Sequence, residues 1–409
     1  MGFLNILNEA TPNTPAAGVS AIFSDINNNG RISCTHPSGH TDILSPIYGN
    51  NQLTNGGFDF IQRWSPTLST NTQTTPGNRY LMHDQWGLVS QTASCQVGRI
   101  DAYTTPITGS VTRYYAQLKQ ITGAGKVMYV NFLGQRDTAN LRGKVVRFQI
   151  KYATGAWGSG SALRLGCIQN NASATGDTIA TVFASAFGAN LADPTLGTNL
   201  AYVAPLTTGL DGDNLTGAAG TNALQITNPA ANATFVRASG LFTVPTNCVN
   251  IGFAIWSDSQ LNVNDVLNLA EAKVVIGQEI NDWNPISIEF ELERAQLWCA
   301  KSFALDTAPA QAITIGTGEW SFAGTVAGAA ANVSGRILFP VRMNKTPTVT
   351  FYNPASANAY VRDVTHSADC TVTTAVNASD TGVSLTCTPT ATGTVGGDLR
   401  VHWLADAGF

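Results

Sequence analysis

Three residues near the start of the sequence carry side chains that bind zinc in many proteins. Cys34, His36 and His40 lie within seven residues of one another, and thiolate and imidazole groups are the usual ligands of a zinc site. Such a site needs a fourth ligand, and the sequence offers none nearby. The intervening Pro37-Ser38-Gly39 favours a turn. We therefore interpret this segment as the tip of a β-hairpin.

A glycine-rich segment shares some features with a phosphate-binding loop. In that motif a longer glycine spacing lets backbone amides enclose the phosphates, and a serine or threonine after the lysine binds magnesium. Here the spacing of Gly123-Ala124-Gly125-Lys126 is too short, and Val127 follows the lysine. We interpret the segment as a hairpin turn.

The acidic residues do not form a recognisable catalytic set. Glu289, Glu291 and Glu293 are spaced two apart in a predicted helix, so they point in different directions and are expected on a solvated surface. His83-Asp84 has no partnered nucleophile, and the Gly-x-Ser-x-Gly motif is absent. Carboxylates that cleave polysaccharide can be distant in sequence, so such an enzyme is one alternative. With only five histidines and few acids in 409 residues, we expect a protein that is not an enzyme.

The composition favours sheets and turns over long surface helices. Charged residues make up 12% of the chain, about half the usual share for a soluble domain, whereas the hydrophobic share of 44% is ordinary. Threonine, serine, asparagine, glycine and alanine take the place of the missing charges. The net charge is −4, and lysines and arginines are scattered singly, so no basic stripe attracts phosphates. We expect no nucleic-acid binding.

The seven cysteines are far apart, odd in number and without a Cys-x-x-Cys pair. A disulfide framework usually shows closer and even spacing, so we expect reduced and mostly buried thiols. The N-terminal segment lacks the basic start and apolar centre of a signal peptide. No apolar run approaches the roughly 18 residues that a membrane span needs. We expect neither secretion by the general route nor insertion into a membrane.

Two segments show the patterns of sandwich strands most clearly. From Val146 to Tyr152, apolar and polar residues alternate, as expected for an antiparallel strand with one dry and one wet face. From Asn250 to Trp256, three large apolar residues form one face, and Gly252, Ala254 and Trp256 share the other. The small neighbours of Trp256 predict an indole that stands clear of its sheet.

Two other segments depart from this strand pattern. The tract at residues 170–232 is rich in asparagine, alanine, threonine and glycine, and is too long for an ordinary connection, so we expect an elaborated or partly mobile surface loop. A helix is predicted from Ser287 to Ser302, because acids cluster in its first half and Lys301 lies near its end, as the helix dipole prefers.

These patterns divide the sequence into four parts. Residues 1–48 combine an extended segment with a meander of short strands, which cannot bury a core alone and is expected to pack against other chains. Residues 49–284 form the main β domain, and residues 285–304 contain the connecting helix. Residues 305–409 return to strands and form a second, smaller β domain.

One segment and the motifs that follow it resemble a known family. Residues 51–63, Asn-Gln-Leu-Thr-Asn-Gly-Gly-Phe-Asp-Phe-Ile-Gln-Arg, resemble the start of jelly-roll domains in bacteriophage tail-fibre, head-fibre and related virion proteins, which are similar to carbohydrate-binding modules. The likeness continues in order at residues 83–86, 115–120, 141–145, 242–245, 265–277 and 290–303. Further segments similar to N- and C-terminal parts of fibre proteins are residues 14–18, 339–343, 346–349 and 403–407.

The resemblance implies an all-β fold, in which an antiparallel jelly-roll sandwich is joined by one short helix to a smaller C-terminal β-sandwich. It implies a virion protein, made in the host cytoplasm and assembled as a homotrimer. Its N-terminal segment is expected to contact other virion proteins, and its sandwich domains to bind host-surface polysaccharide. A purely structural head-decoration or adaptor protein without glycan binding is the alternative of a different class.

The resemblance also assigns a role to two acids. In jelly rolls of this kind, the acid after the Asn-Gly-x-Phe motif and an acid in the last strand help to hold a structural calcium, which suits their hard oxygen ligands. The counterparts here are Asp59 and Glu271. A simpler interpretation is that Asp59 caps a turn. No cofactor is required.

Flat aromatic rings are expected wherever this protein binds sugars. Trp157 lies in a loop of small residues that cannot bury it locally, and Trp256 is expected to stand clear of its strand. Tyr352, Tyr360 and Trp403 are candidates in the C-terminal domain, where they are either tip contacts or part of a trimer core. For each tryptophan the alternative is burial in a core or an interface.

Overall fold

The structure is a computed structural model. It describes residues 8–9, 21–25, 31–35, 41–43, 51–67, 80–90, 95–122, 125–155, 162–171, 196–206, 211–212, 215–216, 222–226, 234–277, 283–324, 333–371, 373–389 and 397–408. His36, His40 and Trp157 lie outside these ranges, so the zinc alternative and one glycan-binding candidate fall on residues that the structure does not describe.

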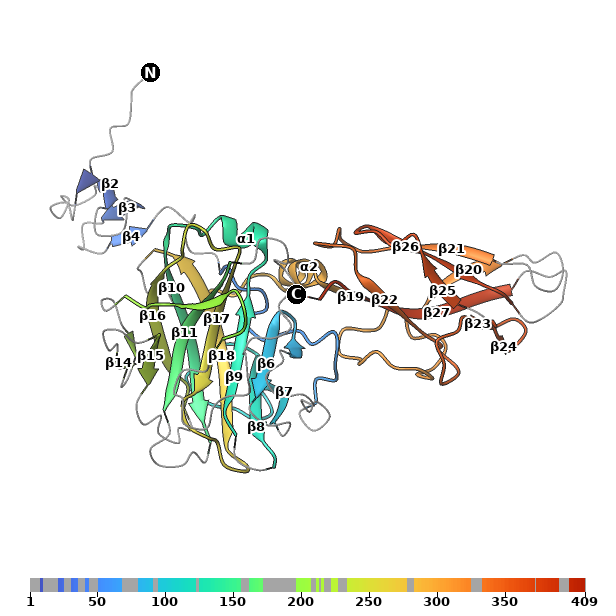
Figure 1. Cartoon of the computed structure of the whole chain (residues 1–409), viewed down its shortest axis with the longest axis horizontal. Coiled ribbons are helices and arrows are strands. Elements are labelled where there is room, and N and C mark those ends of the chain that lie inside the picture. Colours follow the sequence, from blue (N-terminus) through green and yellow to red (C-terminus); the bar gives the residue numbers. More distant parts are fainter. Residues whose placement is uncertain are drawn as a thin grey trace, which may run out of the picture.

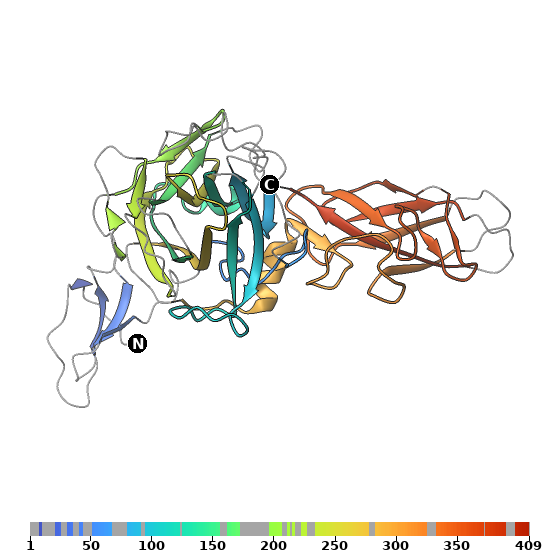
Figure 2. The ribbon, with the colours of Figure 1, turned by 90° about the horizontal axis from the view of Figure 1, so that it is seen from below.

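The molecule is elongated, with a large β-sandwich between a small sheet and a second β domain (Figures 1 and 2). The small sheet lies at the opposite end of the sandwich from the C-terminal domain, and helix α2 lies at the junction of the two larger parts (Figure 1). The small sheet contains the predicted meander and one additional strand, in the order β1 (Asn8–Glu9), β2 (Ala21–Asp25), β3 (Arg31–Thr35) and β4 (Thr41–Ile43).

The large sandwich consists of two facing sheets, and the chain passes back and forth between them. One sheet has six strands, in the order β13 (Asp211–Gly212), β16 (Val236–Thr243), β10 (Val145–Thr154), β18 (Val266–Ile276), β8 (Tyr114–Gln120) and β7 (Cys95–Asp101). The other runs β14 (Leu215–Thr216), β15 (Ala223–Ile226), β11 (Leu163–Asn170), β17 (Asn250–Ser257), β9 (Val127–Phe132), β6 (Trp86–Ser90) and β5 (Tyr80–His83), with β12 (Leu200–Val203) beside β11. The pairings between these strands are antiparallel, which confirms the predicted fold class.

The core of the sandwich is formed by the inward side chains of both sheets, as period-two alternation requires. Phe148 of β10 and Phe253 of β17 meet there, with ring centroids 5.4 Å apart. The prediction of a wet outer face on β10 is wrong, because Arg147 and Gln149 are 3% and 4% exposed. Arg147 is accommodated by a bond from its guanidinium to the Ser239 hydroxyl on the neighbouring strand, at 2.8 Å.

The polar tract at residues 170–232 is more than a loop. Its described parts supply β12 and β15, which both pair with β11, and the two-residue strands β13 and β14. The tract therefore extends both sheets of the sandwich at one side.

The connecting helix is shorter than predicted. Helix α2 spans Ile288–Gln296 and is capped by Ser287, whose hydroxyl accepts a hydrogen bond from the Phe290 amide. The last residues of the predicted helix form strand β19 (Cys299–Lys301) instead, because they pair with the last strand of the C-terminal domain. One further helix in the described residues, α1 (Gln135–Ala139), has a single turn.

The C-terminal domain is organised around one strand. Strand β27 (Gly397–Asp406) pairs with four strands, β19, β20 (Trp320–Gly324), β22 (Thr348–Tyr352) and β23 (Arg362–Asp363), the last of which pairs with β24 (Ala368–Asp369). A second, three-stranded sheet contains β21 (Val333–Leu338), β26 (Gly382–Cys387) and β25 (Thr373–Val376). The hydrophobic core of the C-terminal domain is separate from that of the large sandwich.

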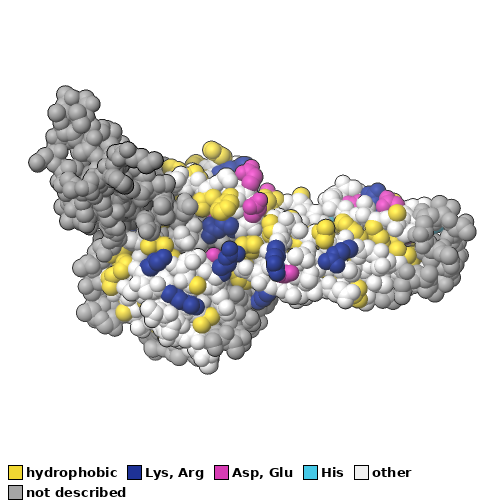
Figure 3. Space-filling view, turned by 90° about the horizontal axis from the view of Figure 1, so that it is seen from above, with side chains coloured by type: hydrophobic (Ala, Val, Ile, Leu, Met, Phe, Trp, Pro, Cys, Tyr) yellow, Lys and Arg dark blue, Asp and Glu magenta, His cyan; other side chains and the backbone are white. Residues whose placement is uncertain are grey.

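Surface charge is sparse and dispersed. On the face shown in Figure 3, the lysine and arginine side chains are spread over the surface, and some of them lie beside acidic side chains. That face has no continuous basic stripe for phosphates to follow. Within the described ranges, no helix has the length and apolar character needed to cross a membrane.

Candidate functional site

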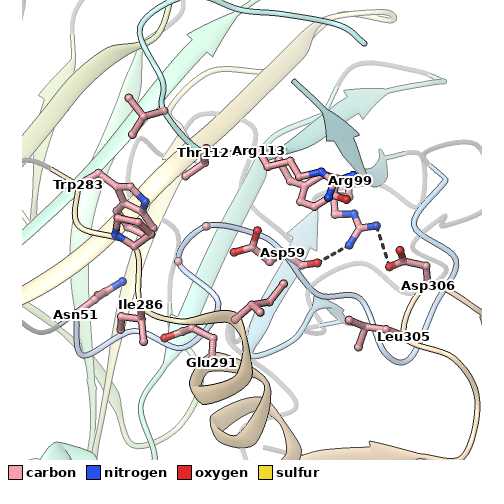
Figure 4. A pocket seen from close by; sticks show the side chains of 16 residues that line it. Asn51, Asp59, Arg99, Thr112, Arg113, Trp283, Ile286, Glu291, Leu305 and Asp306 are labelled. Carbon is pink, nitrogen blue, oxygen red and sulfur yellow. Dashed lines mark hydrogen bonds and ion pairs between the residues drawn. The ribbon is translucent and has the colours of Figure 1, made fainter. Parts of the chain in front are cut away.

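A pocket of about 420 Å³ lies where the large sandwich, the connecting segment and the C-terminal domain meet (Figure 4). Its walls come from residues 51–59, from β7 and the start of β8, from the segment before α2, and from Leu305 and Asp306. This volume is in the usual range for sites that bind small ligands. The pocket is concave and lined by charged and aromatic side chains, which makes it a candidate binding site.

The first wall is shaped by the Asn55-Gly56-Gly57-Phe58 turn. Asn55 and Phe58 both have left-handed backbones, with φ of 57° and 59°. At Gly56 a Cβ atom would clash with the carbonyl oxygen of Ala272 in β18, and at Gly57 it would lie 2.5 Å from an oxygen of Asp59. The two glycines therefore let this turn approach β18 closely and let the Asp59 side chain fold back over it.

The carboxylate of Asp59 faces the pocket between Trp283 on one side and Arg99 and Arg113 on the other (Figure 4). Burial raises the pKa of this carboxyl above its usual value, and the charges of Arg99 and Arg113 partly oppose that shift. In the described part of the chain, no hydrogen bond to its side-chain oxygens is found. Asp59 is thus a hydrogen-bond acceptor that is free to bind a ligand.

The other two carboxylates of the pocket are already engaged. Glu291 accepts from the Asn55 amide at 2.5 Å and from Arg294 at 2.9 Å, so it ties helix α2 to the turn. Burial raises the pKa of Glu291, and Arg294 opposes the shift. The prediction that Glu291 lies on a solvated surface is wrong, since it is 7% exposed. Asp306 pairs with Arg99 at 2.8 Å.

The pocket has two aromatic side chains, and they differ in availability. The Tyr114 ring carries two guanidinium groups, with the Cζ atoms of Arg99 and Arg113 at 4.0 and 4.9 Å from its centroid. Trp283 is half-buried beside Gly56 and has no such partner among the described residues. Trp283 therefore supplies an aromatic surface and an indole N–H for a ligand. The arrangement suits a molecule with one apolar face and several hydroxyl groups.

The acid of the last strand, Glu271, does not line this pocket. It sits at a β-bulge in β18, with φ of 51°, where Glu271 and Ala272 lie opposite the single residue Ile150. Its carboxylate pairs with Lys151 at 2.8 Å and accepts from the Ser110 hydroxyl and the Val111 amide.

These contacts do not fit a calcium site shared by Asp59 and Glu271. Both oxygens of Glu271 are bonded, and the Lys151 ammonium, which also donates to the Gly109 carbonyl at 2.7 Å, already supplies the positive charge. Arg99 and Arg113 add positive charge next to Asp59. In the described ranges no three histidine, cysteine or acidic side chains are grouped as metal ligands. We infer that Lys151 joins the last strand to the neighbouring loop.

Replacing Lys151 with methionine is expected to lower the free energy of unfolding by about 2–3 kcal/mol, because Glu271 would stay buried without its cation. Urea titration measures the change. The exposed Lys144, immediately before the same strand, provides a control, and Lys144→Met is expected to change stability by less than about 0.5 kcal/mol. A chelator should leave the wild-type melting temperature unchanged. A clear fall on calcium removal would contradict this role of Lys151.

The four predicted glycan-binding aromatics that the structure describes lie outside the pocket. Trp256 is fully buried, so the prediction that it stands clear is wrong. The small residues beside it make room for rings from neighbouring positions: a Cβ on Gly252 would meet the Phe132 ring, and one on Gly166 would meet Trp256 itself.

The candidates in the C-terminal domain vary in exposure. Trp403 is 6% exposed and packs on Phe339, with ring centroids 5.7 Å apart. Tyr352 is half-buried and meets Phe303 edge to face at 5.4 Å. Tyr360 is 40% exposed and lies on the surface. Of the aromatic candidates that the structure describes, Tyr360 is the most open to a ligand.

Sequence reasoning missed Trp283, Tyr114 and Arg99 as site residues. One signal was present: Trp283 lies in the connecting segment just before Asn284-Pro285, where no strand pattern explains a large aromatic residue. The family resemblance did single out Asp59, but as a calcium ligand.

Comparisons with known proteins identify no family. No protein-family model matches the sequence, and no curated protein does. Solved structures with some likeness include the enzymatically active domain of bacteriophage CBA120 tailspike protein 4, with a TM-score of 0.29, 11% identity, and coverage of 55% of this chain and 21% of that one. For TmCBM61 in complex with β-1,4-galactotriose, the TM-score is 0.28 and the identity is 9%, with coverage of 55% of this chain and 97% of that one.

The CBM22-1–GH10 modules of Clostridium thermocellum xylanase 10B give a TM-score of 0.27, 11% identity, and coverage of 53% of this chain and 30% of that one. The chain thus spans about a fifth of the tailspike and under a third of the xylanase. Likenesses at this level assign no function to the chain.

Proposed function

We propose that this protein is a fibre or spike component of a bacteriophage virion and binds host-surface glycan in the pocket between Asp59 and Trp283. The observation that carries the proposal is the chemistry of that pocket: a free carboxylate beside an available indole, in a cavity of about 420 Å³. A sugar ring has an apolar face that can stack on an indole and hydroxyl groups that can donate to a carboxylate.

The shape of the molecule supports the fibre part of the proposal. The small N-terminal sheet and the C-terminal domain lie at opposite ends of the sandwich (Figure 1), so one end can attach to a particle while the rest projects. We propose that the N-terminal part contacts other virion proteins and that three copies assemble together. Several weak sugar sites on one particle then act jointly and bind more firmly than one.

The test of glycan binding is a glycan array, followed by titration of the best-bound oligosaccharide with purified variants. We expect Trp283→Ala to weaken binding at least roughly tenfold, since it removes the stacking surface. Asp59→Asn should weaken it as well, because the amide is a poorer acceptor. Tyr103→Ala is the matched control: Tyr103 is 82% exposed and does not line the pocket, so affinity should not change.

Two outcomes would redirect the proposal. If no glycan binds to the wild-type protein at any density, a purely structural role as a head-decoration or adaptor protein is favoured. If incubation with the bound polysaccharide generates new reducing ends, and Asp59→Asn abolishes them, the protein is a cleaving enzyme. Native mass spectrometry tests the trimer separately, and a stable monomer would contradict the fibre assembly.

A further inference from the structure

Two cysteines of the C-terminal domain are neighbours in space, although 17 positions separate them in the chain. Cys370 directly follows β24, and Cys387 is the last residue of β26. Each is 1% exposed, and both belong to the same apolar core. Each thiol perturbs the pKa of the other, which places the two side chains close together.

The backbone holds these two segments side by side. The Thr371 amide donates to the Thr388 carbonyl at 2.9 Å, immediately beyond the two cysteines, and the Thr371 hydroxyl donates to the same oxygen at 3.2 Å. On its other side, the Cys370 amide donates to the Val361 carbonyl at 2.9 Å. Cys387 is held in the ladder of its sheet, opposite Thr373. The backbone at both cysteines is therefore held by hydrogen bonds to neighbouring segments.

No other cysteine pair in the described residues has this arrangement. Cys167 and Cys248 are near enough to influence each other electrostatically, but the Cys248 thiol donates to the Asn250 carbonyl at 2.9 Å instead of to a second thiol. Both are buried and unbridged. They form an internal control pair with similar burial and different contacts.

We propose that Cys370 and Cys387 are a covalent modification site, at which a disulfide forms when the folded protein meets a disulfide oxidant. One thiolate attacks glutathione disulfide, forming a mixed disulfide and releasing one glutathione. The second thiolate then attacks the protein sulfur of that mixed disulfide and releases the second glutathione. Two protein thiols and one glutathione disulfide become one protein disulfide and two glutathione thiols, so atoms and electrons balance.

Access for the oxidant comes from the edge of the sheet. Strand β25, which begins three residues after Cys370, pairs only with β26 in the described structure, and its residues Thr374 to Val376 are exposed. Edge strands open more easily than central ones, so we expect the reaction to be slow and to occur without global unfolding. The cross-link closes a loop of 18 residues and restricts the unfolded chain.

Peptide mapping of the intact protein gives a direct test. Trypsin cleaves after Arg362 and Arg400, with no lysine or arginine between them, so residues 363–400 form one peptide that holds both cysteines. After treatment of the full chain with glutathione disulfide, we expect this peptide to lose about 2 Da and to resist alkylation until it is reduced. Cys167 and Cys248, on separate peptides, should remain alkylatable once the protein is denatured.

Thermal melting supplies a second measurement. The oxidised protein should melt roughly 5–10 °C higher in the transition of the C-terminal domain, and dithiothreitol should reverse the rise. Cys387→Ser removes one sulfur with little change in volume, and neither the mass loss nor the melting shift should appear. If the 363–400 peptide keeps two alkylatable thiols after oxidation, or closes only in denaturing urea, the proposal is overturned. The outcome does not depend on what the pocket binds.

Discussion

Replacing Asp406 with alanine is expected to lower the free energy of unfolding by about 3 kcal/mol, because it leaves the buried Arg63 guanidinium without the carboxylate that accepts two of its hydrogen bonds. Arg63, from the large sandwich, donates to both carboxylate oxygens of Asp406 in β27, at 2.7 and 2.9 Å. The Arg63 side chain is only 7% exposed, and its next carboxylate, Asp84, is 3.6 Å away. This pair joins the two larger domains, so its loss should loosen their junction as well.

Urea unfolding followed by tryptophan fluorescence measures the effect, analysed as separate transitions if the two domains unfold separately. The control is Asp306→Asn, which breaks a second ion pair at the junction, that of Asp306 with Arg99. Asp306 is 56% exposed in its pair with Arg99, so that change should cost no more than about 1 kcal/mol. Equal losses in the two variants would show that burial of Arg63 is not what makes the Asp406 pair important.

The same pair gives a pH dependence with a definite sign. Burial alone would raise the pKa of Asp406, but the charge and hydrogen bonds of Arg63 outweigh it and hold the pKa below the ordinary 3.8. A carboxyl with a lowered folded-state pKa stabilises the fold above its unfolded pKa and loses that contribution as pH falls through the folded value. The stability gap between wild type and Asp406→Ala should therefore be full at pH 7 and shrink below about pH 4.

Gly56→Ala is expected to lower the free energy of unfolding by about 3 kcal/mol. The added Cβ would clash with the Ala272 carbonyl, which is backbone and cannot turn aside. The clash also falls on a backbone pair, since the Ala272 amide donates to the Gly56 carbonyl at 3.0 Å. Relief requires the turn to move away from β18, which breaks that bond. Urea titration at pH 7 provides the measurement.

Gly57→Ala is the matched control, one residue further along the same turn. There the nearest atom to a Cβ is the Asp59 carboxylate oxygen, the end of a side chain that can rotate. We expect a loss below about 1 kcal/mol, together with weaker ligand binding because Asp59 would be displaced into the pocket. If Gly57→Ala destabilised the protein as much as Gly56→Ala, the contact with β18 would not be the reason for the glycine pair.

Local patterns in the sequence predicted the strands well and the boundaries of the helix poorly. The alternation from Val146 to Tyr152 predicted β10, because the period of two is a property of the strand itself. Residues 299–301, in contrast, have a local preference for helix but form β19, because they pair with residues 404–406. A pairing across about a hundred residues leaves no mark on local periodicity.

The burial of Trp256 shows the same limit. The alternation in residues 250–256 predicted on which face of β17 the indole lies, but it did not predict which residues of other strands pack against that face. The space for it is provided by Gly166 on β11, some ninety residues away in the chain. Small residues in one strand are thus as consistent with a buried ring from the next strand as with an exposed one.

The candidate site is a product of four separate segments of the chain. Asp59, Trp283 and Asp306 line one pocket, yet none of their spacings is a motif. The acid was recognisable because the turn before it has a distinctive sequence. The indole and the guanidinium groups became site residues only through the packing of the connecting segment against the sandwich.

The dependence of the C-terminal domain on β27 has a consequence for biosynthesis. Strands β19, β20, β22 and β23 all leave the ribosome before the strand with which they pair. Until residues 397–406 emerge, these four strands lack the partner that joins them into one sheet, whereas the preceding sandwich already has all the strands described for it. A product terminated before residue 397 is therefore expected to combine a folded sandwich with an incomplete, aggregation-prone C-terminal domain.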